Sequence, residues 1–133
     1  MAAQIVAFSN VNHRTLMELP RVDFATATLI TQVVPNPLSN AAKLQNDHLI
    51  LLTKYRAEPS SHLTLEGFLA AKGFVNLLEH AGREVTQASI TASAAGSRPD
   101  CPNGIALPFN AKNDRGSRLA DIAYLCKSGK LVQ

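Results

Sequence analysis

The chain has 133 residues, close to the size of one domain, and 46% of them are hydrophobic, so a real core can form. Charged residues make up only 17% of the chain, which argues against a disordered protein. The formal net charge of +3 comes from scattered basic residues, whereas nucleic-acid-binding proteins cluster them on one element, so we expect no nucleic-acid partner.

The N-terminal residues predict a strand, a polar turn and a short helix. The run at 4–8 is apolar and rich in β-forming residues. Asn12 follows the turn and is suited to cap a helix over 14–19, because an Asn side chain accepts a hydrogen bond from a first-turn amide. Pro20 prevents this helix from continuing.

The strongest predicted strand covers 26–34. Its residues are mostly β-branched with little alternation, which is typical of a strand buried on both faces in the parallel sheet of an α/β fold. Pro35 and Pro37 stop the strand, since each proline forces an extended path and donates no ladder hydrogen bond. We expect a stiff crossover or hinge at this point.

Three helices are predicted in the middle of the chain, over 41–56, 64–81 and 86–95. The second has Thr64 as its expected N-cap and Gly82 as its C-cap. Apolar residues surround most of its circumference, so we expect it to be buried on most sides.

Two glycines, Gly67 and Gly73, lie inside this second helix. Each lowers helix stability by about 1 kcal/mol relative to Ala. Close packing of another backbone would compensate for this cost, so we expect a close neighbour at both positions.

The C-terminal residues predict strands over 103–110, 119–126 and 131–132. If the first two pair as a hairpin, Cys101 and Cys126 lie toward its open end, where a disulfide bond is geometrically possible. The alternative is two buried thiols. Both alternatives stay open, because the sequence does not define the redox compartment.

The sequence contains no recognisable catalytic or metal-binding constellation. The two cysteines form no CxxC pair, and the four histidines are spread along the chain, so we interpret them as surface or helix-face residues. No G-x-S-x-G, G-x-G-x-x-G or Walker motif is present. We therefore expect a protein that is not an enzyme, with no catalytic residues, no cofactor and no metal ion.

Four stretches carry a resemblance to one family. They are 28–37 (TLITQVVPNP), 57–72 (AEPSSHLTLEGFLAAK), 104–110 (GIALPFN) and 114–117 (DRGS). In this order they are similar to the lobe-crossing strand, the following helix, and a late strand and turn of type I periplasmic solute-binding proteins. These proteins, of the Leu/Ile/Val-binding kind, are substrate-binding components of ABC transporters. The resemblance covers essentially the whole chain, which corresponds to roughly the last third of a family member.

The resemblance implies the C-terminal portion of a two-lobed fold, three-layer α/β/α with mostly parallel strands. Residues 1–34 would hold second-lobe strands and a crossover, 35–103 helices of the first lobe, and 104–133 the final crossover and terminal strands. The rest of the two-lobed fold would then be missing. Alone, the chain would expose a large apolar surface, so we expect it to self-associate, by exchange of strands or helices between copies.

The resemblance also suggests site residues. A ligand-facing loop of the family falls on residues 9–12, so the candidate ligand-binding residues are Ser9, Asn10 and Asn12. Turn formation and helix capping are the alternative, which we favour for Asn12. The candidate hinge residues are Gln32, Val33, Val34 and Pro35. Their alternative role is only to form a buried strand and its end.

The implied function is binding without catalysis. Two lobes would close about the hinge on a small polar solute such as an amino acid, for delivery to an ABC permease. The family is periplasmic, although this chain shows no signal peptide. Two alternatives stay open: an extracellular sensor or receptor domain of the same fold, and a small α/β enzyme of unrecognised type.

Overall fold

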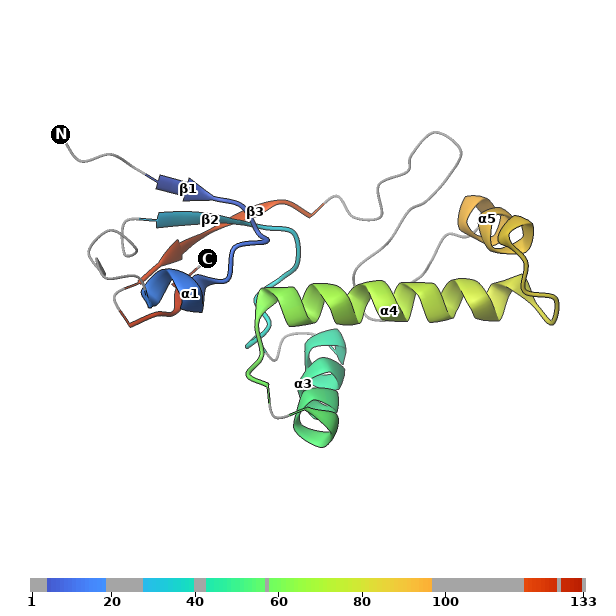
Figure 1. The fold of residues 1–133 in the computed structure, drawn as a ribbon, viewed down its shortest axis with the longest axis horizontal. Coiled ribbons are helices and arrows are strands. Elements are labelled where there is room, and N and C mark those ends of the chain that lie inside the picture. Colours follow the sequence, from blue (N-terminus) through green and yellow to red (C-terminus); the bar gives the residue numbers. More distant parts are fainter. Residues whose placement is uncertain are drawn as a thin grey trace.

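The structure is a computed structural model that describes residues 5–18, 28–39, 43–56, 58–96, 119–126 and 128–132. The molecule is elongated (Figure 1). A small sheet and a short helix lie at one end, and one long helix extends from there to the other end.

The described strands form one sheet of four, in the order β1-β2-β3-β4. They are β1 (Ile5–Ala7), β2 (Thr28–Gln32), β3 (Asp121–Leu125) and β4 (Leu131–Val132). The α/β class is confirmed, but the expectation of mostly parallel strands is wrong here. Only β1 and β2 are parallel, and β3 is antiparallel to both β2 and β4. The turn between β3 and β4 is short, and a short turn can join only antiparallel strands.

The two faces of this sheet have different surroundings. Thr28, Ile30 and Gln32 of β2 are buried, whereas Leu29 and Thr31 are half-buried. Because successive side chains point to opposite faces, one face is enclosed and the other is partly open in the described part of the chain. The expected burial of this strand on both faces is therefore wrong for the described residues.

The C-terminal strands agree with the pattern in the sequence. β3 and β4 confirm the strands predicted over 119–126 and 131–132. The strand predicted over 103–110 lies outside the described residues. Cys126 is half-buried, and Cys101 lies outside the described residues, so a disulfide between the two stays a prediction.

The helices also fall close to their predicted positions. They are α1 (His13–Met17), α3 (Lys43–Tyr55), α4 (His62–Ala81) and α5 (Gln87–Gly96). Asn12 is the N-cap of α1, as predicted, and its side-chain oxygen accepts a hydrogen bond from the backbone N–H of Arg14 at 3.0 Å.

Helix α4 begins before Thr64, because Ser61 and not Thr64 is its N-cap. The Ser61 hydroxyl accepts from the Thr64 N–H at 3.2 Å, and the Thr64 hydroxyl oxygen accepts from the Ser61 N–H at 2.9 Å. This is a capping box, in which the side chain at the third helical position accepts a hydrogen bond from the backbone N–H of the N-cap residue. Thr64 occupies that third position, and a Thr there resembles an N-cap in the sequence. Gly82 ends the helix as predicted, at a φ of 80° that favours glycine.

A small hydrophobic core joins the end of β2 to the helices. Val33 and Phe68 pack against a cluster of four buried residues: Val34, Leu44, Leu65 and Leu69. Beside it, Lys72 of α4 donates to the carboxylate of Asp47 on α3 at 2.9 Å. The segment that follows β2 is therefore anchored between α3 and the first half of α4.

The second half of α4 extends beyond this core. Phe74 and Val75 are each 52% exposed, so this part of α4 presents apolar side chains to solvent. A methyl group added at Gly67 would meet no atom within 4 Å in the described part of the chain, so the close neighbour expected there stays a prediction. Within the described ranges, no helix is long and apolar enough to cross a membrane.

Candidate functional site

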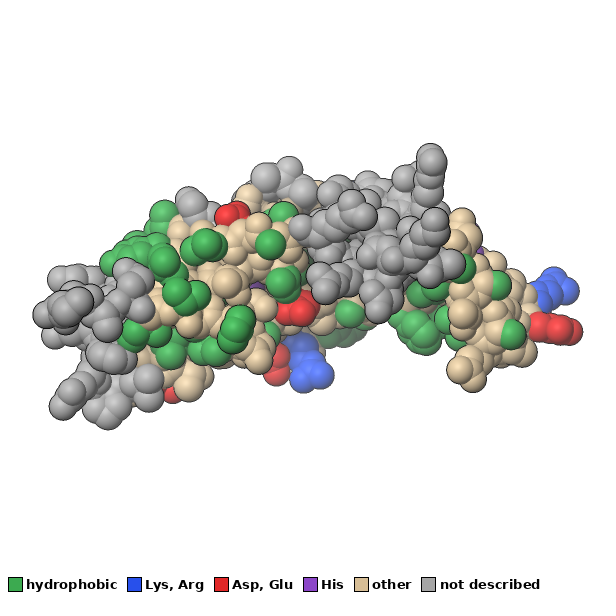
Figure 2. All heavy atoms as spheres, turned by 90° about the horizontal axis from the view of Figure 1, so that it is seen from above, with side chains coloured by type: hydrophobic (Ala, Val, Ile, Leu, Met, Phe, Trp, Pro, Cys, Tyr) green, Lys and Arg blue, Asp and Glu red, His purple; other side chains and the backbone are tan. Residues whose placement is uncertain are grey.

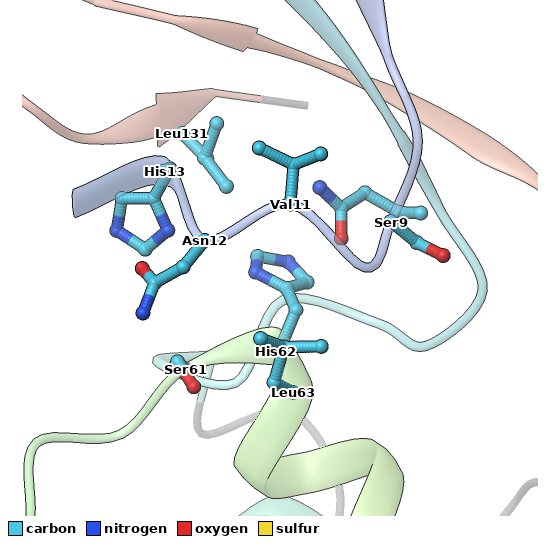
Figure 3. A pocket seen from close by; sticks show the side chains of 9 residues that line it. Ser9, Val11, Asn12, His13, Ser61, His62, Leu63 and Leu131 are labelled. Carbon is cyan, nitrogen blue, oxygen red and sulfur yellow. The ribbon is translucent and has the colours of Figure 1, made fainter. Parts of the chain in front are cut away.

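A small cavity, whose lining surface is mostly apolar but includes several polar side chains, lies where the sheet meets the start of α4 (Figure 3). The loop after β1, the end of β2, the first turn of α4 and one residue of β4 surround it. Its volume is about 10 Å³, which is about the room that one water molecule needs. The described residues that line it are Ser9, Val11, Asn12, His13, Gln32, Ser61, His62, Leu63 and Leu131.

Two of the three candidate ligand-binding residues line this cavity, namely Ser9 and Asn12. Asn10 is exposed and is not among the described lining residues. Asn10 is exposed because it occupies a central position of a tight turn. In this turn the N–H of Val11 donates to the carbonyl of Phe8 at 3.0 Å. Asn12 lines the cavity and also caps α1, so both roles considered for it are compatible.

The four candidate hinge residues connect the cavity to the helical core. Gln32 lines the cavity, is 1% exposed, and its side-chain oxygen has no hydrogen-bond partner among the described residues. Val33 and Val34 pack in the core with α3 and α4, and Pro35 follows half-buried. This placement joins the sheet to the helices, while motion about these residues stays a prediction.

His62 is the residue at this site that the sequence did not reveal. It opens α4, and its ring points toward the loop at Val11 (Figure 3). The residue is 8% exposed, and neither ring nitrogen has a hydrogen-bond partner in the described part of the chain. Of the two alternatives predicted for His62, a surface or a helix-face residue, the surface alternative is therefore wrong, and His62 is a buried residue of the first turn of α4. Only the Ser-Ser-His cluster before an apolar helix pointed to polar chemistry there, and nothing local in the sequence indicated burial.

The electrostatics of the cavity favour neutral histidines. Burial, and then the nearby His13, lowers the pKa of His62 to about 4. Burial, and then the charge of Arg14, lowers the pKa of His13 as well. None of the described lining residues is acidic. Hydroxyl, amide and neutral imidazole groups donate and accept hydrogen bonds, so these side chains of the cavity can bind one polar group of a solute.

Solved structures of longer proteins have the fold of this chain. A possible leucine/isoleucine/valine-binding protein from Rhodopirellula baltica matches 100% of the chain with a TM-score of 0.84 and 21% identity. A substrate-binding periplasmic protein from Ralstonia solanacearum matches 99% with a TM-score of 0.84 and 20% identity. An extracellular ligand-binding receptor from Verminephrobacter eiseniae matches 96% with a TM-score of 0.75 and 18% identity.

The chain spans only 36%, 38% and 37% of the lengths of these three proteins, in the same order. No protein-family model and no curated protein matches the sequence. At this level of identity the likeness is one of fold. The fold of this chain is thus that of a little over a third of a periplasmic binding protein of the Leu/Ile/Val-binding type.

Proposed function

We propose that this chain is the C-terminal part of a solute-binding protein of an ABC importer, and that it supplies one side of the site for an amino acid or a similar small polar solute. The observation that carries this proposal is the match of nearly the whole chain, at a TM-score of 0.84, to two binding proteins. In this proposal the protein binds without bond chemistry and needs no catalytic residue or cofactor.

The loop after β1 would provide the solute contacts. Ser9 and Asn12 line the cavity with His62, and a carboxylate or amide oxygen of the solute would take the place of one water there. A cavity of about 10 Å³ cannot hold a whole amino acid, so the rest of the solute would lie outside it. Asn10, exposed on the neighbouring turn, would contact that outer part.

The two lobes would divide this chain as the resemblance implies. Residues 1–34 would hold second-lobe strands and a crossover, residues 35–103 helices of the first lobe, and residues 104–133 the final crossover and terminal strands. The sheet lies at one end of the molecule and α4 extends from it toward α5 at the other end, an arrangement that supports this division (Figure 1). Closure would turn about Gln32, Val33, Val34 and Pro35, because hinge motions are absorbed by a few residues at the ends of elements.

The same proposal places the protein in the periplasm, where an ABC permease would receive the solute. One matched protein is described as an extracellular ligand-binding receptor, which favours a sensor as the second candidate. The solute site would be the same in both cases. The two differ in partner, so attachment to an output domain would identify the sensor.

An NMR titration of the isotope-labelled chain tests the solute site. Half of a site binds weakly, and a Kd of about 1 mM corresponds to about −4 kcal/mol, which chemical-shift changes detect. We expect at least one free amino acid to shift the amide resonances of Ser9, Asn10, Asn12 and His62 and to leave those of α5 unchanged. Shifts absent with every amino acid, or confined to α5, would count against the proposal.

A matched pair of substitutions sharpens this titration. Asn12→Asp keeps the cap of α1, because Asp caps a helix about as well as Asn, but it adds a negative charge at the cavity. Asn36→Asp is the matched control, because it adds the same charge at a residue that does not line the cavity. Like Asn12, Asn36 accepts a hydrogen bond from a nearby backbone N–H, that of Leu38, at 3.0 Å. We expect only Asn12→Asp to weaken binding of a solute carboxylate, by several-fold.

A further inference from the structure

Two of the polar side chains that line the cavity are almost fully buried. Gln32 at the end of β2 is 1% exposed, and His62 at the start of α4 is 8% exposed. Within the described ranges, the Oε1 atom of Gln32 and both ring nitrogens of His62 have no hydrogen-bond partner. Because buried polar groups in folded proteins are almost always hydrogen-bonded, these atoms indicate a partner that enters the cavity.

The surroundings of these atoms are largely apolar. The lining surface of the cavity is mostly apolar, and hydrophobic side chains gather over this end of the molecule (Figure 2). A polar atom without a partner is more costly in such surroundings than in water, so a group that satisfies it is bound more strongly. The volume of about 10 Å³ limits that group to about the size of one water molecule.

The unsatisfied atoms also define the chemistry of the entering group. The Gln32 oxygen only accepts, so its partner has to donate. Burial lowers the pKa of His62 to about 4, so at pH 7 its neutral ring offers one N–H and one lone pair. A carboxylate cannot donate to Gln32, an ammonium group cannot accept from His62, and an alkyl group does neither. An O–H group does both and has the required size.

We propose that the cavity binds one O–H group, which is either the side-chain hydroxyl of the solute or a water molecule. This group donates to the Gln32 oxygen and accepts from the ring N–H of His62, and so connects the end of β2 to the first turn of α4. With a solute hydroxyl, the inference rests on the proposed function and narrows the solute to a hydroxy amino acid or a similar small alcohol. With a water molecule, it holds without that function.

An NMR titration with two solutes of equal shape tests the solute hydroxyl. L-threonine and L-valine differ in one position, where a hydroxyl replaces a methyl group. We expect threonine to bind more tightly by about fivefold or more, because a site that hydrogen-bonds a hydroxyl rejects the analogue without it. The ring nitrogen resonances of His62 should shift with threonine and stay in place with valine.

A nuclear Overhauser effect between water and the ring protons of His62 tests the water molecule in the same samples. If threonine enters the cavity, any such cross-peak should disappear when threonine saturates the chain. A cross-peak that persists while threonine and valine bind equally identifies water as the occupant. If neither amino acid binds and the cross-peak is present, the proposed solute site fails while this inference stands.

A matched pair of substitutions connects these signals to Gln32. Gln32→Met removes the amide with little change of volume, so it should abolish the preference for threonine and weaken the water cross-peak. Gln45→Met makes the same change at a residue that is 3% exposed and does not line the cavity, and it should leave both signals unchanged. Circular dichroism establishes that each variant is folded.

A chain that shows neither a water cross-peak nor a preference for threonine would overturn the proposal. Signals that Gln32→Met leaves unchanged, or that Gln45→Met removes equally well, would also overturn it. If Gln32→Met fails to fold, His62→Phe replaces it, because this change keeps a planar ring but removes both ring nitrogens. A threonine preference or a water cross-peak at the ring that survives in that variant would overturn the proposal.

Discussion

Leu65→Ala tests whether the core between β2, α3 and α4 stabilises the fold. Leu65 is 0% exposed and belongs to the cluster with Val34, Leu44 and Leu69. Replacing a buried Leu with Ala lowers the free energy of unfolding by about 2–5 kcal/mol, because transfer free energy is lost and a cavity remains. Two helices and a strand end enclose this site and restrict its collapse, so we expect a loss of about 3 kcal/mol.

Urea denaturation followed by circular dichroism measures this loss. Leu51→Ala removes the same atoms from the surface of α3, where Leu51 is 40% exposed, and should lower the free energy of unfolding by less than about 1 kcal/mol. Leu65→Met conserves volume and should cost less than about 1.5 kcal/mol. Equal losses for Leu65→Ala and Leu51→Ala would refute the assignment of this core.

Three further predictions concern α4. Ser61→Ala should lower the free energy of unfolding by about 1 kcal/mol, and Ser61→Asp should restore most of it, in urea titrations. Because the pKa of His62 is about 4 in the folded chain, below its ordinary 6.5, only the unfolded chain takes up this proton between those values. Stability should fall as the pH drops from 6.5 to 4, and His62→Gln should flatten the fall. A double-mutant cycle on Lys72 and Asp47 should give below about 1 kcal/mol, and less in high salt.

The positions of the elements could be predicted from the sequence because their signals are local. The β-branched run gave β2, Asn12 marked the start of α1, and Gly82 marked the end of α4. The direction of the strands could not be predicted in this way. It depends on which strands pair across long distances, and an apolar run shows neither the partner nor the orientation of β3.

The candidate site was predictable only in part, for a related reason. Ser9 and Asn12 lie in a polar loop after a strand, a pattern that the sequence displays directly. The roles of Gln32 and His62 depend on tertiary packing, because both are buried only where β2 and α4 meet. A histidine directly after a helix cap has the same local sequence whether it is exposed or enclosed.

The gene sequence upstream of the Met1 codon is the most direct test of the proposal that this chain is the C-terminal part of a two-lobed binding protein. We predict an in-frame coding region for the remaining strands and helices of both lobes, preceded by a signal peptide. An in-frame stop codon with a promoter between it and Met1 would contradict this proposal.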